Sequence, residues 1–521
     1  MRYKSSWESF VHPEPESRFA ADSEIKEMFE TVDLTQEKYP ASGIPLHVAG
    51  DNVIVNNETE HHIIWGETAS KKTRALIRPL IMTLIGAGES LIVSDVKGEL
   101  STQPQIIGHL TDKCYNIVYM DFKDFSGDGY NILEFPFKLY CQNQKSKAMS
   151  LVASLINALS RKYTKSDRDP FWHIMGEQYV IAVISILFEV FCQHPDYHKY
   201  VNIFTIASYC DDTGISRLSE IFNNYLLDVS NPSMTMLRGV LAAPERTRAS
   251  IVAVAAGMFK DFIINDALLT MLSNSTFDIK SIYSKPTCIF LIIPDEHSTY
   301  DCIAGLMIDA FYSSIIETFS KEFQNKKPPK CRINWVCDEF CNLAVNDMRA
   351  KISASRSRDM RWFLVCQSKR QLEDVTGIDA ATILGNCKNT WFLKSSDVKM
   401  LEYISDACGK TCVTEKDEDE PIISVEKLKT LKKEWTFIEC IYLRDNTKYR
   451  AILPDINEYK HLEKYADFII PNCSKLENCT VEAYEPHILL NEMKNGLIMI
   501  PFCGTYVRQG PEPINELTDE W

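Results

Sequence analysis

The segment WGETASKKTRALIRP at residues 65–79 keeps most of a pattern that binds phosphate groups. In the full pattern, G-x-x-x-x-G-K-[ST], backbone N–H groups surround the phosphates, the Lys reaches the β and γ oxygens, and the hydroxyl helps to hold magnesium. Gly66, Lys72 and Thr73 occupy three of the four fixed positions, but Lys71 stands where the second Gly belongs. Taken alone, the segment is either an impaired phosphate loop or an ordinary polar turn.

A pair of carboxylates follows a short apolar run much later in the chain. The run RINWVCDEF at 332–340 predicts a buried strand that ends in Asp338 and Glu339. In enzymes that hydrolyse nucleotides, such an Asp holds the magnesium shell and the adjacent Glu polarises the attacking water. The same pair also ends strands in proteins that bind no nucleotide, so it is weak evidence by itself.

The next apolar run, RWFLVCQS at 361–368, ends in Gln367. The amide of Gln367 could position or sense a γ-phosphate, or it could simply cap the end of the strand. The phosphate loop, the Asp-Glu strand and this polar-tipped strand follow one another in the order expected of one site. Such a site lies at the carboxyl ends of parallel strands, where sheets of this kind bind ligands.

The elements that must position these residues alternate between sheet and helix. Apolar segments at 45–142 follow the βαβ rhythm of a parallel sheet, long helical periodicities replace them at 143–270, and strand-like runs return after 271. We therefore expect an α/β fold in which an all-α domain interrupts a domain with a parallel-rich central sheet. The predicted division is an N-terminal extension at 1–44, a nucleotide-binding domain at 45–142 and 271–465, the helical insert at 143–270, and a peripheral segment with an acidic tail at 466–521.

Composition narrows the class of protein. The 521 residues carry 56 basic and 71 acidic side chains, a net charge of −15, so any contact with nucleic acid must come from a local patch. The best apolar run, at 179–191, falls short of the roughly 20 residues that span a bilayer. The N-terminus lacks the apolar core of a secretory signal. Seventeen cysteines without a C-x-x-C pair indicate a reduced, cytoplasmic protein.

As a set, several segments resemble the TraG/TraD-type coupling proteins of conjugation and type IV secretion. That family consists of hexameric motor ATPases that deliver DNA and protein substrates to a secretion channel. The resemblance covers residues 60 to 410 in the order of the family. It rests on VSDVKGEL at 93–100, GDGYNILEFP at 127–136, DPFWHIMGEQ at 169–178, TRASIVAVAAGMF at 247–259, IPDEHST at 293–299, CDEFCNLA at 337–344, SRSRDMRWFLVCQSKRQLEDVTG at 355–377 and ILGNCKNTWFLKSSD at 383–397.

The resemblance implies a RecA-like P-loop NTPase domain that binds ATP and Mg²⁺. Glu339 and Gln367 are the implied catalytic groups, and Thr73 and Asp338 the implied magnesium ligands. Asp95 lies in a segment that matches the D-P-K-G-E motif of the family, with Val96 in place of Pro, and is placed near the nucleotide or the subunit interface. The implied nucleotide-binding residues are Gly66, Thr68, Ser70, Lys71, Lys72, Thr73 and Asp95.

Two departures from the family matter. Membrane helices usually precede the motor and are not evident here, so a separate anchor protein or a soluble member is expected. The usual T-G-S-G-K-T loop reads with Ala69 and Lys71 at its two glycines. Non-glycine residues held at positive φ cost about 1–2 kcal/mol each, so we expect weakened binding of nucleotide. Lys71 could compensate with a second ammonium, which Glu67 would oppose.

The stretch at 353–371 is the densest basic segment within these motifs. Its hydroxyl and guanidinium groups suit the tracking of a phosphate backbone without sequence preference. Arg356 or Arg358 could instead act as a catalytic finger on the nucleotide of a neighbouring subunit. A solvated helix with scattered charge is the alternative. The predicted nucleic-acid contacts are Arg356, Arg358, Arg361, Lys369 and Arg370.

The function expected from the resemblance is a coupling-protein motor. It would deliver single-stranded DNA with its bound relaxase, or protein substrates, to a type IV secretion channel, with relaxosome or adaptor proteins as further partners. We expect a homo-hexamer when active, located in the cytoplasm at the inner face of the membrane. A scaffold with the same fold that does not hydrolyse ATP is the alternative, and a double-stranded DNA pump is disfavoured by the motif set.

Overall fold

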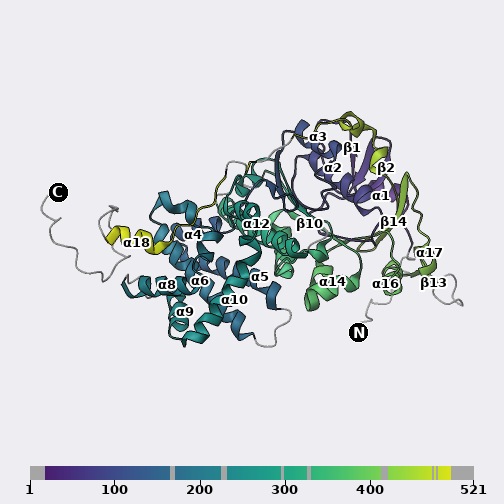
Figure 1. Cartoon of the computed structure of the whole chain (residues 1–521). Coiled ribbons are helices and arrows are strands. Elements are labelled where there is room, and N and C mark those ends of the chain that lie inside the picture. Colours follow the sequence, from purple (N-terminus) through teal and green to yellow (C-terminus); the bar gives the residue numbers. More distant parts are fainter. Residues whose placement is uncertain are drawn as a thin grey trace, which may run out of the picture.

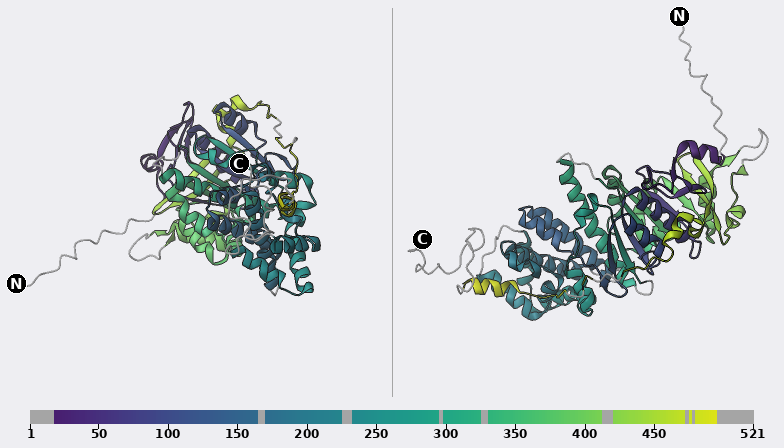
Figure 2. Two further views of the ribbon diagram at one scale, coloured as in Figure 1. Left: turned by 90° about the vertical axis from the view of Figure 1, so that its left-hand side faces the viewer. Right: turned by 90° about the horizontal axis from the view of Figure 1, so that it is seen from above.

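The computed structural model describes residues 18–164, 170–224, 232–294, 298–324, 330–411, 420–471, 475–476 and 479–494. Two regions lie next to each other: a sheet covered by helices, and a region whose described residues form helices and no strands (Figure 1). The views in Figure 2 show the same division. Residues 295–297 of the quoted IPDEHST segment and the acidic tail at 509–521 lie outside the described residues.

One large sheet forms the centre of the first region. Its strand order is β15-β14-β11-β4-β10-β9-β5-β8-β6-β7. Neighbours from β11 through β6 run parallel, whereas β14, β15 and β7 are antiparallel additions at the two edges. The predicted α/β fold with a parallel-rich sheet is therefore confirmed. The strands are β4 (His62–Trp65), β5 (Ser90–Val96), β6 (Asn116–Asp121), β7 (Ser126–Gly127), β8 (Thr287–Ile293), β9 (Ile333–Cys337), β10 (Met360–Cys366), β11 (Asn389–Phe392), β14 (Phe437–Arg444) and β15 (Thr447–Pro454).

The central strands are buried along their whole length because helices cover both faces of the sheet, as parallel sheets require. Alternate residues of β10 divide between the faces: Phe363 and Val365 pack with α2 (Arg78–Ala87) and α3 (Pro104–Asp112). On the other face Trp362 stacks on Trp335, with ring centroids 4.6 Å apart. The helices of that face are α12 (Ser298–Gln324), α13 (Met348–Ser355), α14 (Lys369–Thr376), α15 (Ala380–Asn386) and α16 (Val398–Cys408).

The described N-terminal residues form a small antiparallel sheet beside the large one. Its order is β1 (Glu30–Asp33), β3 (Asn52–Val55), β2 (Pro45–Ala49), and α1 (Asp22–Met28) precedes it. Tyr39, between β1 and β2, ties this sheet to α2, since its backbone N–H donates to the carbonyl of Gly86 at 2.9 Å. The segment expected as an extension at 1–44 thus includes strand β1, which belongs to this second sheet.

The helical region fills the interval between β7 and β8. Its central helix, α6, is buried over most of its length. Among the described residues, two helical stretches, Phe171–Phe191 and Tyr300–Ser320, are long and apolar enough to cross a membrane, but 78% and 67% of the apolar 18-residue part of each is buried inside the protein. Such burial is typical of core helices. The helices between β7 and β8 are α4 (Glu134–Cys141), α5 (Lys145–Thr164), α6 (Phe171–Phe191), α7 (Ile203–Ala207), α8 (Asp212–Asn224), α9 (Pro232–Leu241), α10 (Glu245–Ile263) and α11 (Asp266–Ser273).

The C-terminal segment crosses from the sheet region back to the helical region. The carbonyl of Glu482 accepts a hydrogen bond from the Asn202 side chain at 3.0 Å, and Glu485 forms an ion pair with Arg217 at 2.5 Å. Helix α18 (Pro486–Lys494) then packs against α6 and α8 (Figure 1). The described part of the segment expected to be peripheral is therefore bonded to the helical region.

We expect Gly86→Ala to destabilise the protein, although alanine is the better helix former. A Cβ at residue 86 would lie 2.0 Å from the ring of Tyr39. Overpacking costs about 1–3 kcal/mol, more than the ~1 kcal/mol that helix propensity returns. Gly257→Ala in α10 is the control and should stabilise, because nothing lies within 4 Å of the added Cβ. Urea unfolding measures both variants, and shifts of the same sign would contradict this packing.

Candidate functional site

The phosphate loop at 66–73 follows β4 and is held by the two strands next to it. The Gly66 N–H donates to the carbonyl of Cys366 at 3.1 Å, and the Glu67 N–H donates to the carbonyl of Lys394 at 3.0 Å. The loop also closes on itself: a Cβ on Gly66 would lie 2.6 Å from the Ser70 hydroxyl. A side chain at residue 66 would therefore have to displace the Ser70 hydroxyl and press on the side chain of Lys72.

Both residues that replace glycine adopt the left-handed backbone conformation. The φ angle is 62° at Ala69 and 66° at Lys71. The loop thus keeps the backbone shape that glycine would supply, at a cost of about 1–2 kcal/mol for each residue. Lys72 then starts the helical segment, in which Thr73–Ile77 forms one π-helical turn before α2. Local strain of this kind persists where surrounding contacts hold the backbone in place.

The side chain of Lys71 supplies such contacts. Its ammonium donates to the carbonyls of Glu434 at 2.8 Å and Trp435 at 2.7 Å, and it lies 3.4 Å from the Asp455 carboxylate. Asp455 is 2% exposed and also pairs with Arg74 at 2.7 Å. In this structure Lys71 ties the loop to the segment before β14, and the second ammonium expected for the triphosphate stays a prediction.

The other predicted groups converge at the carboxyl ends of β4, β9 and β10. The Lys72 ammonium donates to the Gly66 carbonyl at 2.7 Å and lies 3.6 Å from a Glu339 carboxylate oxygen. The Thr73 hydroxyl lies 3.4 Å from the Asp338 carboxylate. The Gln367 amide donates to Glu339 at 2.9 Å. An ammonium, a hydroxyl, two carboxylates and an amide thus form one polar cluster.

The electrostatics of this cluster favour a bound cation. Burial, and after it the adjacent Glu339 carboxylate, raise the pKa of Asp338 to about 6 against the opposing effect of Lys72. The neighbours of Asp338 therefore leave its carboxylate without enough positive charge nearby. A divalent ion beside Asp338 and Thr73 would supply that charge. The Ser70 hydroxyl is buried and has no hydrogen-bond partner among the described residues. The loop therefore fits a ligand that brings oxygen acceptors and Mg²⁺.

The remaining predicted loop residues differ in what they contact. Thr68 is exposed. Asp95 is 1% exposed, and its carboxylate accepts hydrogen bonds from the backbone N–H groups of Leu100 at 2.9 Å and Ser101 at 2.7 Å. Burial raises the pKa of Asp95. These bonds shape the loop after β5, so the structure gives Asp95 a role in positioning that loop and not a contact in the polar cluster.

The basic stretch at 353–371 does not form one patch. Arg356 and Arg358 precede β10, whereas Lys369 and Arg370 follow it, and a seven-residue strand is about 23 Å long. Arg356 and Arg358 therefore lie at the edge of the sheet opposite Glu339 and Gln367, and in this chain they do not join the cluster. Lys369 and Arg370 lie on α14, 3.7 Å and 3.8 Å from Glu373 and Asp374.

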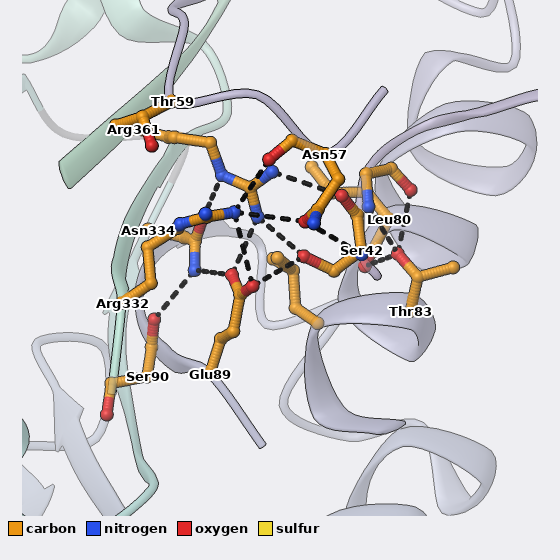
Figure 3. Close-up of polar contacts among 12 residues, drawn as sticks. Ser42, Asn57, Thr59, Leu80, Thr83, Glu89, Ser90, Arg332, Asn334 and Arg361 are labelled. Atoms are coloured by element: carbon orange, nitrogen blue, oxygen red, sulfur yellow. Dashed lines mark hydrogen bonds and ion pairs between the residues drawn. The ribbon is translucent and has the colours of Figure 1, made fainter. Parts of the chain in front are cut away.

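Arg361 is fully buried, so its predicted contact with nucleic acid is wrong. Its guanidinium pairs with Glu89 at 2.6 Å and donates to Asn334 at 2.8 Å and to the Ser42 hydroxyl at 2.7 Å. Arg332 also lies beside Glu89, at 3.4 Å (Figure 3). The sequence shows a basic residue at the start of a strand, but only the fold shows that this position lies under the N-terminal segment.

Sequence reasoning also missed Trp435 and Asp455. Lys71 and Asp455 are 384 positions apart, and no motif marks either acceptor. Ser94, within β5, was missed as well; its hydroxyl donates to the Asp338 carbonyl at 2.9 Å. Its only sequence signal is its place directly after the apolar run Leu91–Val93.

A family model described as "Type IV secretory system Conjugative DNA transfer" matches residues 18–434. This chain belongs to that family. The resemblance to coupling proteins that the motifs indicated is therefore confirmed. No curated protein sequence matches the chain.

Solved structures with the same fold include forms of the bacterial conjugative coupling protein TrwB. The unbound form TrwBdeltaN70 has 14% identity and a TM-score of 0.57, covering 85% of this chain and 93% of that chain. TrwB in complex with the ATP analogue ADPNP has 14% identity and a TM-score of 0.54, covering 90% and 97%. TrwB with ADP and Mg²⁺ has 15% identity and a TM-score of 0.55, covering 90% and 96%. The likeness shows the RecA-like P-loop NTPase fold.

We expect Lys71→Met to destabilise the protein more than Lys71→Gly. Both variants lose the ammonium contacts to residues 434, 435 and 455, but only Met keeps a side chain at positive φ. The difference in unfolding free energy should be about 1–2 kcal/mol in favour of Gly. Urea unfolding of the two variants measures it directly, and equal stabilities would show that the loop is not strained at residue 71.

Arg361→Met should lower the free energy of unfolding by about 3–5 kcal/mol, because it leaves Glu89 without its closest cation in a nearly buried site. Arg370→Met is the matched control, since Arg370 is 83% exposed and surface changes stay within about 0.5 kcal/mol. Thermal or urea unfolding compares them. A loss of DNA binding by Arg361→Met without loss of stability would restore Arg361 as a nucleic-acid contact.

Proposed function

We propose that this protein is an ATP-dependent coupling motor that delivers single-stranded DNA, with its relaxase, or protein substrates to a type IV secretion channel. The observation that carries the proposal is the cluster of Lys72, Thr73, Asp338, Glu339 and Gln367 in one site of a family member. Retention of both carboxylates beside the loop favours hydrolysis over simple binding.

Each group in the cluster has a defined task in this proposal. Lys72 neutralises phosphate charge, and the N–H groups of the loop at 66–73 surround the phosphates. Thr73 and Asp338 would hold Mg²⁺, which supplies positive charge to the phosphate oxygens. Glu339 accepts a proton from the attacking water, and Gln367, already bonded to Glu339, holds that carboxylate in place.

The contacts with DNA are proposed for the basic side chains that remain at the surface. Arg356 is exposed, and Arg370 is 83% exposed. Arg358 donates a hydrogen bond to the Ala354 carbonyl at 2.6 Å, and the Lys369 ammonium forms an ion pair with Glu373 at 3.7 Å. Because Arg356 and Arg358 lie opposite the nucleotide cluster of their own chain, a finger role for them requires a neighbouring subunit in a ring. We propose a homo-hexamer for this reason, placed at the cell membrane by channel and anchor proteins.

A scaffold that does not turn over ATP is the second candidate. The observation that favours it is the backbone of Ala69 and Lys71, both held at positive φ where glycine is the unstrained residue. Such a scaffold would keep the docking surfaces and the fold while nucleotide binds weakly or only for structure. The two candidates differ in turnover.

The test is Mg²⁺-dependent ATP hydrolysis by the assembled protein, with and without single-stranded DNA. Glu339→Gln keeps the shape of the side chain and removes the base, so we expect turnover to fall about 10²-fold or more while ATP binding survives. Glu373→Gln is the matched control, because Glu373 is 51% exposed on α14. Binding without turnover in the wild-type protein would select the scaffold. Absence of binding as well would reject the nucleotide site.

A further inference from the structure

We propose that Trp435 is a stacking platform for the base of a purine nucleoside triphosphate bound at the loop. This inference rests on the proposed nucleotide site and adds to it the part that recognises the base. Trp435 lies in the turn that leads into β14, and its own carbonyl accepts a hydrogen bond from Lys71 of the phosphate loop at 2.7 Å. Loop and indole are therefore direct neighbours.

The turn that carries Trp435 is rigid. Lys433 and Ile438 form an antiparallel bridge, and the Glu434 N–H donates to the Phe437 carbonyl at 2.9 Å. The Thr436 carbonyl accepts from the Asp455 N–H at 2.7 Å. The Lys433 ammonium reaches the Ala69 carbonyl of the loop. A rigid support lowers the entropy cost of holding a ligand ring.

The indole itself is open to solvent. Trp435 is 81% exposed, far above the next exposed aromatic side chains in the described residues, Phe171 at 46% and Phe204 at 36%. A large aromatic surface left in water beside a ligand site is characteristic of a binding surface. The Lys71 ammonium lies 5.7 Å from the ring centroid and favours one orientation of the ring by a cation–π contact.

The strand order shows which end of the nucleotide would reach Trp435. Glu339 and Gln367 follow β9 and β10, on one side of β4 and its loop, and mark where the γ-phosphate reacts. Strands β11 and β14 lie on the other side of β4. A triphosphate that crosses the loop from Glu339 must therefore extend its nucleoside toward β14, and Trp435 stands two residues before that strand begins.

A planar purine is the ligand group that fits this surface. The indole is apolar and planar, and stacking needs no specific hydrogen-bond partner, so ATP and GTP would both use it. Stacking of a base on an aromatic side chain changes affinity by about 5- to 100-fold. Inorganic tripolyphosphate, which has no base, would occupy the same loop without contacting Trp435.

The experiment compares ATP with tripolyphosphate, each with Mg²⁺, by calorimetric titration of the full chain. Trp435→Ala should bind ATP about 5- to 100-fold more weakly and tripolyphosphate unchanged, whereas Trp435→Phe should keep most of the affinity for ATP. Ile378→Ala, at a residue that is 94% exposed in the short helical turn after α14, is the control and should change neither. ATP should quench the fluorescence of the wild type more than that of Trp435→Phe.

Three results would overturn the inference. Unchanged binding of ATP by Trp435→Ala would exclude stacking of the base on Trp435. Equal weakening of ATP and tripolyphosphate would make Trp435 a support of the loop through Lys71 and not a contact of the base. Failure of the wild type to bind either ligand would reject the nucleotide site itself, and the inference with it.

Discussion

The parallel alignment of β4, β10 and β9 is the constraint on which the site depends. Ladder hydrogen bonds pair Val365 with Ile64 and Phe363 with Val336, so the three strands end at one edge. Thr73 and Asp338 are 265 positions apart in the chain, yet their oxygens come within 3.4 Å. A shift of one residue in either pairing would turn every side chain of a strand to the opposite face. Both faces are packed with apolar side chains, and that packing prevents such a shift.

The polar groups at the two edges of the sheet differ in how completely they are paired. At the carboxyl edge, polar groups remain incompletely paired. Asp338 has a raised pKa, and the buried hydroxyl of Ser70 has no partner among the described residues. At the opposite edge, Arg361 has its hydrogen bonds satisfied by Glu89, Asn334 and Ser42 (Figure 3). Buried charge is stable where it is fully paired and reactive where it is not. The pairing, more than the residue types, separates the functional edge from the structural one.

The phosphate loop holds a backbone shape that its own residues disfavour. Ala69 and Lys71 keep positive φ because contacts from outside the loop hold them there: Lys433 binds the Ala69 carbonyl, and Lys71 binds the segment before β14. Those contacts come from the antiparallel edge of the sheet, and its residues are not part of the phosphate-loop sequence pattern. Loss of glycine has therefore made the loop depend on a distant part of the same domain.

The sequence by itself determined the α/β class, the helical interruption and the principal groups of the site. Periodicity identifies a buried strand, and a polar residue directly after such a strand must lie at the sheet edge, which is why Asp338, Glu339 and Gln367 were predicted together. Only the tertiary structure decided what surrounds each charge. Arg361 and Arg370 are alike in sequence, but one is buried against Glu89 and the other is 83% exposed. Likewise, Lys71 turns to Glu434 and Trp435 because β14 brings those carbonyls beside the loop, a proximity that no local pattern carries.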